Sequence, residues 1–287
     1  MIVVPYLIYL ALIAIVWALV GSALPAIFRI LRRMRSGVAR WISEPGLTER
    51  MLSFLPESVL KLKPYAALLA IVIAGSLAAI LIGELFIDLA QGLLEGNPVM
   101  EQIDQAVHGW AEEQRTGYLT TFYLTFSTLG DPLGLTTILL LGIALALLRR
   151  EWSLAAYLAL TSGIGALLNR LLKLYFGRER PDLFFALTDA AHESFPSGHT
   201  MGSAIILGAL AYAALRLTPS WRLKSFWISV SLVTMLTIAA SRIYLGVHWT
   251  TDIAAGFSAG FAWLLTSIVV YETYRRIGPR PEAAGAN

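Results

Sequence analysis

Long apolar segments alternate with short polar ones over most of the chain. About 20 helical residues are needed to cross a hydrocarbon core, and seven of the segments approach that length. The third is short, and residues 118–129 can supply a further turn to it. The pattern predicts an all-α, polytopic bundle of transmembrane helices. The expected spans lie near residues 2–21, 65–88, 132–148, 153–173, 199–216, 225–241 and 251–271.

Two connecting segments have the periodicity of amphipathic helices. In RILRRMRSGVARWI, residues 29–42, apolar side chains recur at helical spacing and arginines occupy the opposite face. This pattern is typical of a helix in the cytoplasmic headgroup region, although a plain basic tether has the same composition. In the second segment, Val99, Ile103, Val107 and Trp110 predict a helix on the outer surface. The apolar face of the first consists of Ile30, Leu31, Met34, Val38, Trp41 and Ile42.

Composition supports a membrane protein. The chain is 57% hydrophobic and 14% charged, with a mean hydropathy of +0.67, which is too apolar for a soluble domain. It contains no cysteine, so disulfides, thiolate metal sites and cysteine nucleophiles are excluded. A net charge of +3 is compatible with a nucleic-acid partner, but the basic residues cluster at the ends of apolar segments. That distribution indicates membrane lipids as partners, and no nucleic acid.

The basic residues also predict the orientation in the membrane. If the spans alternate in direction, most arginines and lysines fall on one side, which the positive-inside rule assigns to the cytoplasm. The first span has no basic residues before it and Arg29 after it, which favours a retained anchor over a cleaved signal peptide. Two connections on the outer side break the rule because they carry several basic residues. The basic cytoplasmic connections are residues 22–64, 149–150, 216–224 and 275–280.

The first outer exception is KLYFGRERP, residues 173–181, which contains Lys173, Arg178 and Arg180. Cations at a helix C-terminus can simply complement the helix dipole, but these lie on the side expected to be poor in positive charge. Guanidinium and ammonium groups both bind phosphate oxygens. The cluster therefore indicates a site for a dense anion.

The second cluster, SFPSGHT at residues 194–200, directly precedes a predicted helix. Ser197 and Gly198 lie in a turn before the helix, where free backbone N–H groups and the helix dipole favour anions. Ser197 can alternatively act only as an N-cap. His199, in the first helical turn, is placed to give a proton to a leaving oxygen.

The third cluster, SRIYLGVHWTTD at residues 241–252, lies at the start of the last span. On a helix that begins near residue 247, His248 and Asp252 are four residues apart and share one face. The carboxylate can then hold one imidazole nitrogen and leave the other free as a nucleophile. Arg242 adds a cation for the attacked phosphoryl group. The alternative is a satisfied polar pair at a helix end.

Taken in order, the clusters read KxxxxxxRP, PSGH and SRxxxxxHxxxD, and the chain resembles the type 2 phosphatidic acid phosphatase family. No named position departs from the family pattern. The resemblance covers six spans and implies a six-helix phosphatase core at residues 65–273. An N-terminal transmembrane helix with a basic cytoplasmic linker precedes it at 1–64, and a short cytoplasmic tail follows at 274–287.

The resemblance implies a vanadate-sensitive lipid phosphatase that needs no metal or other cofactor. In the family, the residue matching His248 forms a phosphohistidine, the residue matching Asp252 supports it, and the residue matching His199 protonates the leaving group. The expected substrates are undecaprenyl diphosphate, phosphatidylglycerophosphate or phosphatidic acid, cleaved at the extracytoplasmic face of the plasma membrane. The positions that match phosphate-binding residues are Lys173, Arg180, Ser197, Gly198 and Arg242.

Four alternatives remain at this stage. A lipid-to-lipid phosphotransferase would use the same residues. A transporter would place charges near the midplane of several spans, whereas the charged clusters lie at one face, with only Asn169 and Arg170 inside a span near that end. A vanadate-dependent haloperoxidase has a similar site but is soluble. A lipid-binding protein without activity is disfavoured because every expected catalytic residue is present.

Overall fold

The computed structural model describes residues 3–42, 66–182, 186–189 and 193–277, and all regular structure in these ranges is helical. Six of the described helices are long and apolar enough to cross a membrane, or seven spans result if a bent pair counts as one. The prediction of an all-α transmembrane bundle is confirmed. The helices are α1 (Val3–Ile42), α4 (Ala66–Leu94), α5 (Pro98–Glu113), α6 (Gly117–Gly130), α7 (Pro132–Leu148), α8 (Trp152–Phe176), α9 (Gly198–Leu217), α10 (Trp221–Tyr244) and α11 (Thr250–Ile277).

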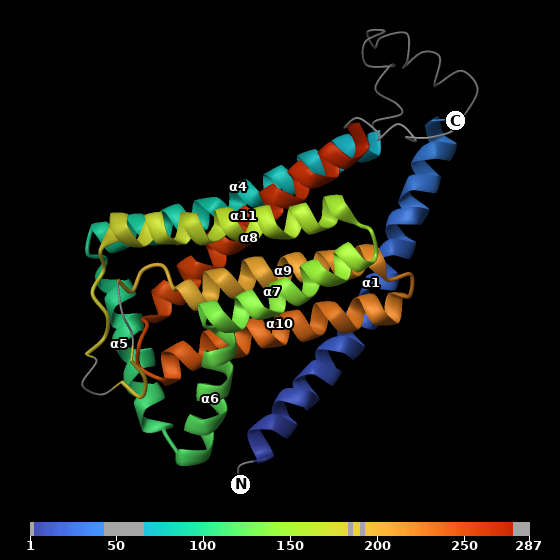
Figure 1. The fold of residues 1–287 in the computed structure, drawn as a ribbon. Coiled ribbons are helices and arrows are strands. Elements are labelled where there is room, and N and C mark those ends of the chain that lie inside the picture. The colour runs from blue at the N-terminus through green and yellow to red at the C-terminus, as the bar shows by residue number, and fades with distance from the viewer. Residues whose placement is uncertain (1–2, 43–65, 183–185, 190–192, 278–287) are drawn as a thin grey trace.

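Helix α9 lies inside the bundle and packs on α11, α10, α8 and α7, while α4 runs along α11 (Figure 1). Two glycines let α9 and α11 approach closely. A β-carbon at Gly256 would lie 2.9 Å from the backbone oxygen of Ser197, and one at Gly260 would lie 2.9 Å from the side chain of Ala204. This close approach holds the start of α9 against the first turns of α11, so two of the three clusters meet there.

Two apolar clusters connect the central helices of the bundle. One joins α8, α9 and α11 through residues such as Leu158, Ala209 and Leu264. The other joins α6, α9 and α10 through Phe126 and Ile238. Because lipid tails are as apolar as these side chains, the clusters stabilise the bundle mainly by close packing. In the most hydrophobic stretch of each helix, only 6% of the residues of the peripheral α1 and α4 are buried inside the protein. The corresponding share is 39–44% for α8 to α11.

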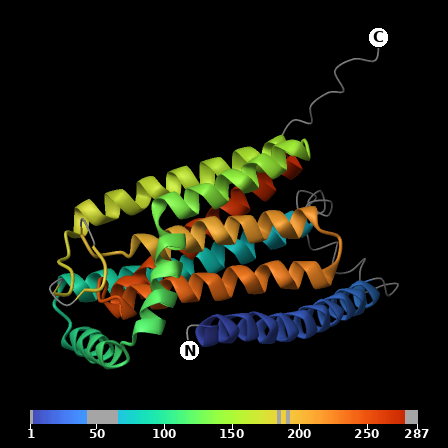
Figure 2. The same cartoon turned by 60° about the horizontal axis from the view of Figure 1, so that its bottom comes forward.

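Helix α1 crosses the outside of the bundle along α10 (Figure 2). The Tyr9 hydroxyl lies 2.7 Å from that of Thr234, and the Trp17 indole donates to the carbonyl of Arg222 at 3.0 Å. The segment at residues 29–42 is helical as predicted, but it continues α1 without a break. Its location in the headgroup region stays a prediction. The rest of the proposed linker, residues 43–64, lies outside the described residues.

The third expected span is broken in two. Helices α6 and α7 meet at an angle of 57°. Asp131 separates them with an extended backbone, φ −65° and ψ 157°. Pro132 explains the break, because a proline disfavours helical geometry in the residue before it and has no N–H to continue the ladder. The bend places Asp131 at the end of the bundle where the polar clusters lie.

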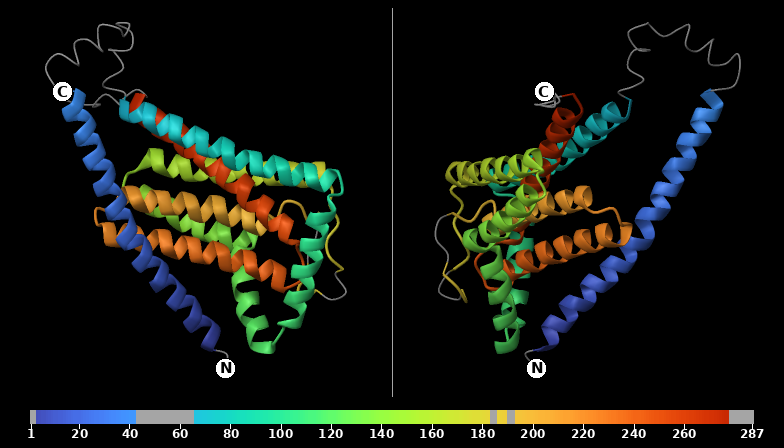
Figure 3. Two further views of the ribbon diagram at one scale, coloured as in Figure 1. Left: turned by 180° about the vertical axis from the view of Figure 1, so that it is seen from behind. Right: turned by 45° about the vertical axis from the view of Figure 1, so that its right-hand side comes forward.

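The predicted outer helix is α5, which lies with α6 across that same end of the bundle (Figure 3). Asn97 caps it by accepting hydrogen bonds from the amides of Val99 and Met100. Its apolar side chains are exposed, with Ile103 at 47% and Trp110 at 62%. The face turned toward the bundle instead carries Asp104, which is 2% exposed. A carboxylate is thus the deepest polar group of this helix.

Candidate active site

The three clusters converge on one cavity of about 600 Å³ at the end of the bundle. It extends along one face of α8 and is closed by α6, α7 and α9. Ser197 and Asp252 are fully buried and do not line the cavity, and Arg178 does not line it either. The residues expected from the sequence that do line it are Lys173, Arg180, Gly198, His199, Arg242 and His248.

His248 and Asp252 form the expected pair, although His248 does not lie on the helix as predicted. Helix α11 begins at Thr250, so His248 lies in the turn before the helix and not on its face. Gly246, with φ +77°, reverses the chain after α10 in a conformation that favours glycine. The turn buries His248 to 2% exposure, with Nδ1 3.2 Å from Oδ2 of Asp252. The same oxygen accepts a hydrogen bond from the amide of Trp249 at 2.9 Å.

Arg180 contacts the other side of the His248 ring. Its Nη1 lies 3.2 Å from Nε2 and donates to the carbonyl of Val247 at 2.6 Å. With Asp252 accepting from Nδ1, Nε2 is the acceptor nitrogen and its lone pair points toward the cavity. Burial lowers the pKa of His248, and Arg180 and Arg242 act in the same direction, while Asp252 opposes them. The balance favours a neutral imidazole. Burial also lowers the pKa of Arg180.

His199 has a carboxylate partner that the sequence analysis missed. Its Nε2 lies 2.6 Å from Oδ1 of Asp131, the residue at the α6–α7 bend. Asp131 is 46% exposed, so this pair lies at the water-accessible edge of the cavity. An acidic residue directly before a proline inside an apolar segment was the available signal. No local pattern indicates that Asp131 lies beside a residue 68 positions later.

The remaining cations face the cavity and donate to neutral groups. Lys173 donates to the carbonyl of Glu193 at 2.5 Å. Arg242, 4% exposed, donates to the hydroxyl of Ser127. Among the described residues, neither cation forms an ion pair with a carboxylate. Positive charge that is buried without a counterion favours a bound anion.

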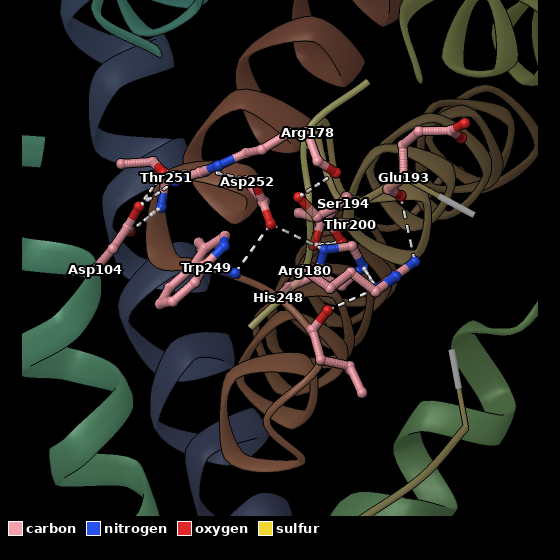
Figure 4. A network of polar contacts seen from close by, with 12 residues as sticks. Asp104, Arg178, Arg180, Glu193, Ser194, Thr200, His248, Trp249, Thr251 and Asp252 are labelled. Atoms are coloured by element: carbon pink, nitrogen blue, oxygen red, sulfur yellow. Dashed lines mark hydrogen bonds and ion pairs between the residues drawn. The ribbon is translucent and has the colours of Figure 1, made fainter. Parts of the chain in front are cut away.

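A further group lies behind Asp252 (Figure 4). It joins Arg178, which the sequence analysis placed in the anion-binding cluster but which does not line the cavity, to Asp104, which the sequence analysis missed. Arg178 donates from Nη1 to Oδ1 of Asp252 at 2.7 Å and from Nη2 to Oδ2 of Asp104 at 2.8 Å. Asp104 also accepts from the amide and the hydroxyl of Thr251, at 2.9 and 2.6 Å. The guanidinium stacks over Trp249, 5.7 Å from the ring centroid. Arg178 is thereby shared between two buried carboxylates.

Ser197 lies at the N-cap position of α9, but its side chain makes no capping hydrogen bond. Its hydroxyl accepts a hydrogen bond from that of Thr200 at 3.1 Å, and its amide donates to the carbonyl of Asp252 at 3.0 Å. Gly198 begins the helix, where the first backbone amides have no intrahelical partner. A β-carbon at Gly198 would lie 3.1 Å from the side chain of Asn169 and 3.6 Å from that of Lys173. The absence of a side chain leaves that part of the cavity open.

No group of three or more histidine, aspartate or glutamate side chains that could hold a metal ion occurs among the described residues. Three carboxylates at this end, those of Asp104, Asp131 and Asp252, pair with arginine or histidine. The arrangement therefore offers cations and imidazoles to an anionic ligand.

Comparison with known proteins identifies a family. A family model described as the PAP2 superfamily matches residues 150–276. Phosphatidylglycerophosphatase B of Bacillus subtilis is 35% identical over 153 residues, which cover 53% of this chain and 70% of that protein. Decaprenylphosphoryl-5-phosphoribose phosphatase of Mycobacterium tuberculosis is 31% identical over 136 residues, 45% and 66% of the two chains. The crystal structure of a transmembrane PAP2 type phosphatidylglycerolphosphate phosphatase from Bacillus subtilis superposes with a TM-score of 0.63 at 28% identity, over 71% of this chain and 98% of that one.

Proposed function

The chain belongs to the PAP2 superfamily, and from this premise we propose that it is a membrane phosphatase that hydrolyses a lipid phosphomonoester or diphosphate. The observation that carries the proposal is the cavity in which His248, His199 and three cations face one another. The relatives support a lipid substrate, because they are named as phosphatases of phosphatidylglycerophosphate and of a decaprenyl lipid. Candidate substrates are undecaprenyl diphosphate, phosphatidylglycerophosphate and phosphatidic acid.

In the proposed first step, Nε2 of His248 attacks the phosphorus atom. The P–N bond forms as the bond to the leaving oxygen breaks, and His199 gives that oxygen a proton. Asp252 stabilises the positive charge that develops on the ring by accepting from Nδ1. Arg180 must turn from Nε2 to the phosphoryl oxygens, where it joins Lys173 and Arg242 in stabilising the transition state.

In the proposed second step, a water molecule attacks the phosphohistidine. His199, neutral after the first step, accepts a proton from the water, and inorganic phosphate leaves with the P–N bond broken. Asp131 supports both steps because it holds Nε2 of His199 when that nitrogen carries a proton. The cycle needs no metal ion. Both imidazoles return to their initial protonation states.

Behind the cavity, Arg178 and Asp104 are proposed to hold Asp252. Arg178 occupies Oδ1 of Asp252, so only Oδ2 is available to the imidazole and the rotation of the carboxylate is restricted. Asp104 holds Arg178 in this position and also binds Thr251, the residue before Asp252. These residues position the catalytic pair without touching the substrate.

We propose that the cavity faces the extracytoplasmic side of the plasma membrane. The opposite end of the bundle carries the arginine-rich connections that the positive-inside rule assigns to the cytoplasm. Residues 65–273 form the phosphatase core in this proposal, with residues 1–64 as an added anchor and basic linker. The chain has no native cysteine, so single cysteines at Glu95 and Pro219 can be labelled selectively. An impermeant thiol reagent should modify the first and not the second in intact cells, and the reverse would overturn the orientation.

The test of the proposed function is phosphate release by the purified protein in detergent. We expect release from at least one of the three candidate lipids, with activity retained in EDTA and inhibited by vanadate, which adopts the five-coordinate geometry of in-line transfer. A strict requirement for Mg²⁺ would refute the metal-free mechanism. Transfer of the phosphoryl group to a second lipid, without release of inorganic phosphate, would identify a phosphotransferase instead.

A further inference from the structure

An arginine of α8 lines the same cavity and takes no part in the contacts described above. Arg170 is exposed and makes no hydrogen bond or ion pair with a residue that the structure describes. An ionisable side chain inside a membrane-spanning helix is costly and usually marks a polar partner or a substrate path. Since α8 spans Trp152 to Phe176, Arg170 lies within the span and not in the loop that follows. Its position therefore calls for an anionic partner within the cavity.

The cavity changes character along α8. Its water-facing end includes Asp189 and Glu193 of the loop, and Lys173 follows with the histidines. Arg170 is three residues before Lys173, which is about 4.5 Å further along the helix axis. Beyond it the lining becomes small and apolar, with Gly165 and Ile205. Arg170 thus lies between the cluster that faces the reacting phosphate and the apolar part suited to a lipid tail.

This order constrains what Arg170 can contact. When the terminal phosphate lies at His248 and the tail extends into the apolar part, the group that connects them passes beside Arg170. A guanidinium presents a planar fork that matches phosphate oxygens. Phosphatidic acid has only an uncharged glycerol diester at this position. A lipid diphosphate has its second phosphate there, directly beside the first. Phosphatidylglycerophosphate has its phosphodiester one glycerol unit further toward the lipid tail.

We propose that Arg170 binds a second phosphate of the substrate, located between the reacting phosphate and the lipid tail. The inference rests on the proposed function and narrows it to lipids that carry two linked phosphates. A lipid with one phosphate leaves Arg170 without its partner and is a poorer substrate. Asn169, the neighbouring lining residue, is instead turned to α9, where its amide donates to the sulfur of Met201 at 3.2 Å.

The experiment compares kcat/KM of the wild type and Arg170→Gln on an isoprenoid diphosphate, phosphatidylglycerophosphate and phosphatidic acid in detergent. We expect a loss of about 10-fold or more on the first two substrates, from a hydrogen-bonded charge pair, and less than about 2-fold on phosphatidic acid. Arg170→Lys should recover part of the loss because it keeps the charge. Arg149→Gln, an exposed change at the opposite end of the bundle, is the matched control and should alter none of the three rates.

Inhibition by small anions provides a measurement that does not depend on lipid presentation. Inorganic pyrophosphate should inhibit the wild type more strongly than inorganic phosphate, and Arg170→Gln should remove this difference while leaving phosphate inhibition unchanged. An equal loss on all three lipids, or no loss on any, would overturn the inference. If the wild type cleaves none of the lipids, the proposed function itself fails. A thermal shift by pyrophosphate relative to phosphate then still decides whether Arg170 binds a second phosphate.

Discussion

Both ends of the bundle carry a buried carboxylate close to cations. At one end the cations line a cavity together with two histidines, whereas at the other end they surround the carboxylate itself. At the end opposite the cavity, Glu272 accepts from the Tyr212 hydroxyl at 2.5 Å and from Arg216 at 3.2 Å. Its other oxygen accepts from Arg275 and Arg276 at 2.9 and 3.1 Å. The three arginines are 26–36% exposed, so water solvates the positive charge that Glu272 does not neutralise.

At the cavity end, the carboxylate and the cations are separated. Asp252 is saturated by Arg178, His248 and an amide, whereas Lys173 and Arg242 line the cavity and have only neutral partners among the described residues. Their charge has neither a carboxylate nor much water to offset it. A cluster of charges at a helix end is therefore not by itself a substrate-binding site. Buried cations directed into a cavity, beside an imidazole with a free nitrogen, distinguish the candidate site from the structural cluster.

The largest expected effect is a loss of turnover when the cavity end is changed, compared with almost no loss when the opposite end is changed. His248→Ala removes the atom that bonds to phosphorus, so phosphoenzyme formation should fall below detection and turnover by at least about 10³-fold. Glu272→Gln should leave turnover within about 2-fold and lower the melting temperature, because it removes acceptors from a buried cluster. Labelling with radioactive substrate, quenched in alkali since phosphohistidine is acid-labile, checks both. A labelled His248→Ala together with an unlabelled His199→Ala would reverse the roles of the histidines.

The next largest effect is expected from removing His199, the proposed proton donor at the cavity end. His199→Ala should slow the cleavage of a lipid phosphate by about 10²-fold or more, because an alkoxide leaves poorly without a proton. The loss should be much smaller on p-nitrophenyl phosphate, whose leaving group needs no proton. The ratio of the two rate constants for phosphoenzyme formation measures the effect. Equal losses on both substrates would show that His199 does not act as the acid.

A smaller effect is expected behind the cavity, at the residues that hold Asp252. Arg178→Gln should lower kcat by about 10-fold to 100-fold with little change in KM, since it loses hydrogen bonds to a carboxylate that does not touch the substrate. In an Asp252→Ala background the same substitution should cost almost nothing further, because the two residues act through one contact. Asp104→Asn should behave like a milder Arg178→Gln. Additive losses in the double variant would instead indicate a general structural role.

The smallest expected effect is that of pH on the rate of phosphoenzyme formation, which should hardly change between pH 7 and pH 5.5. Burial lowers the pKa of His248, so the imidazole stays neutral and nucleophilic as the pH falls through 6.5, its ordinary value. Phosphoenzyme formation from p-nitrophenyl phosphate should then change by less than about 3-fold between pH 7 and pH 5.5. An imidazole of ordinary pKa would be only about one-tenth neutral at pH 5.5 and would lose about 10-fold. A loss of that size would contradict a buried, neutral His248.

Much of the fold could be read from the chain because its signals are local. The spans follow from runs of apolar residues, and the helix α5 follows from helical periodicity. The 57° bend before Pro132 was not predicted, because residues 118–129 were expected to extend the third span. The boundaries were less certain. The prediction that the last helix starts near residue 247 was wrong, since Gly246 turns the chain and α11 begins at Thr250. The pair formed nonetheless, because His248 in the turn still lies within reach of Asp252.

The residues able to bind and cleave a phosphate could be identified from the amino-acid sequence, because the three motifs carry them at short, fixed spacings. The groups that support these residues become visible only once the helices are packed. Asp104 meets Arg178 across 74 residues and Asp131 meets His199 across 68, and in each case a crossing or bent helix brings the carboxylate into place. The packing of the helices also turned the Ser197 side chain away from the cavity and left Arg170 inside it. The physical reason is that hydrophobic periodicity and turn chemistry specify where a helix runs, whereas contacts between distant side chains depend on how the helices pack against one another.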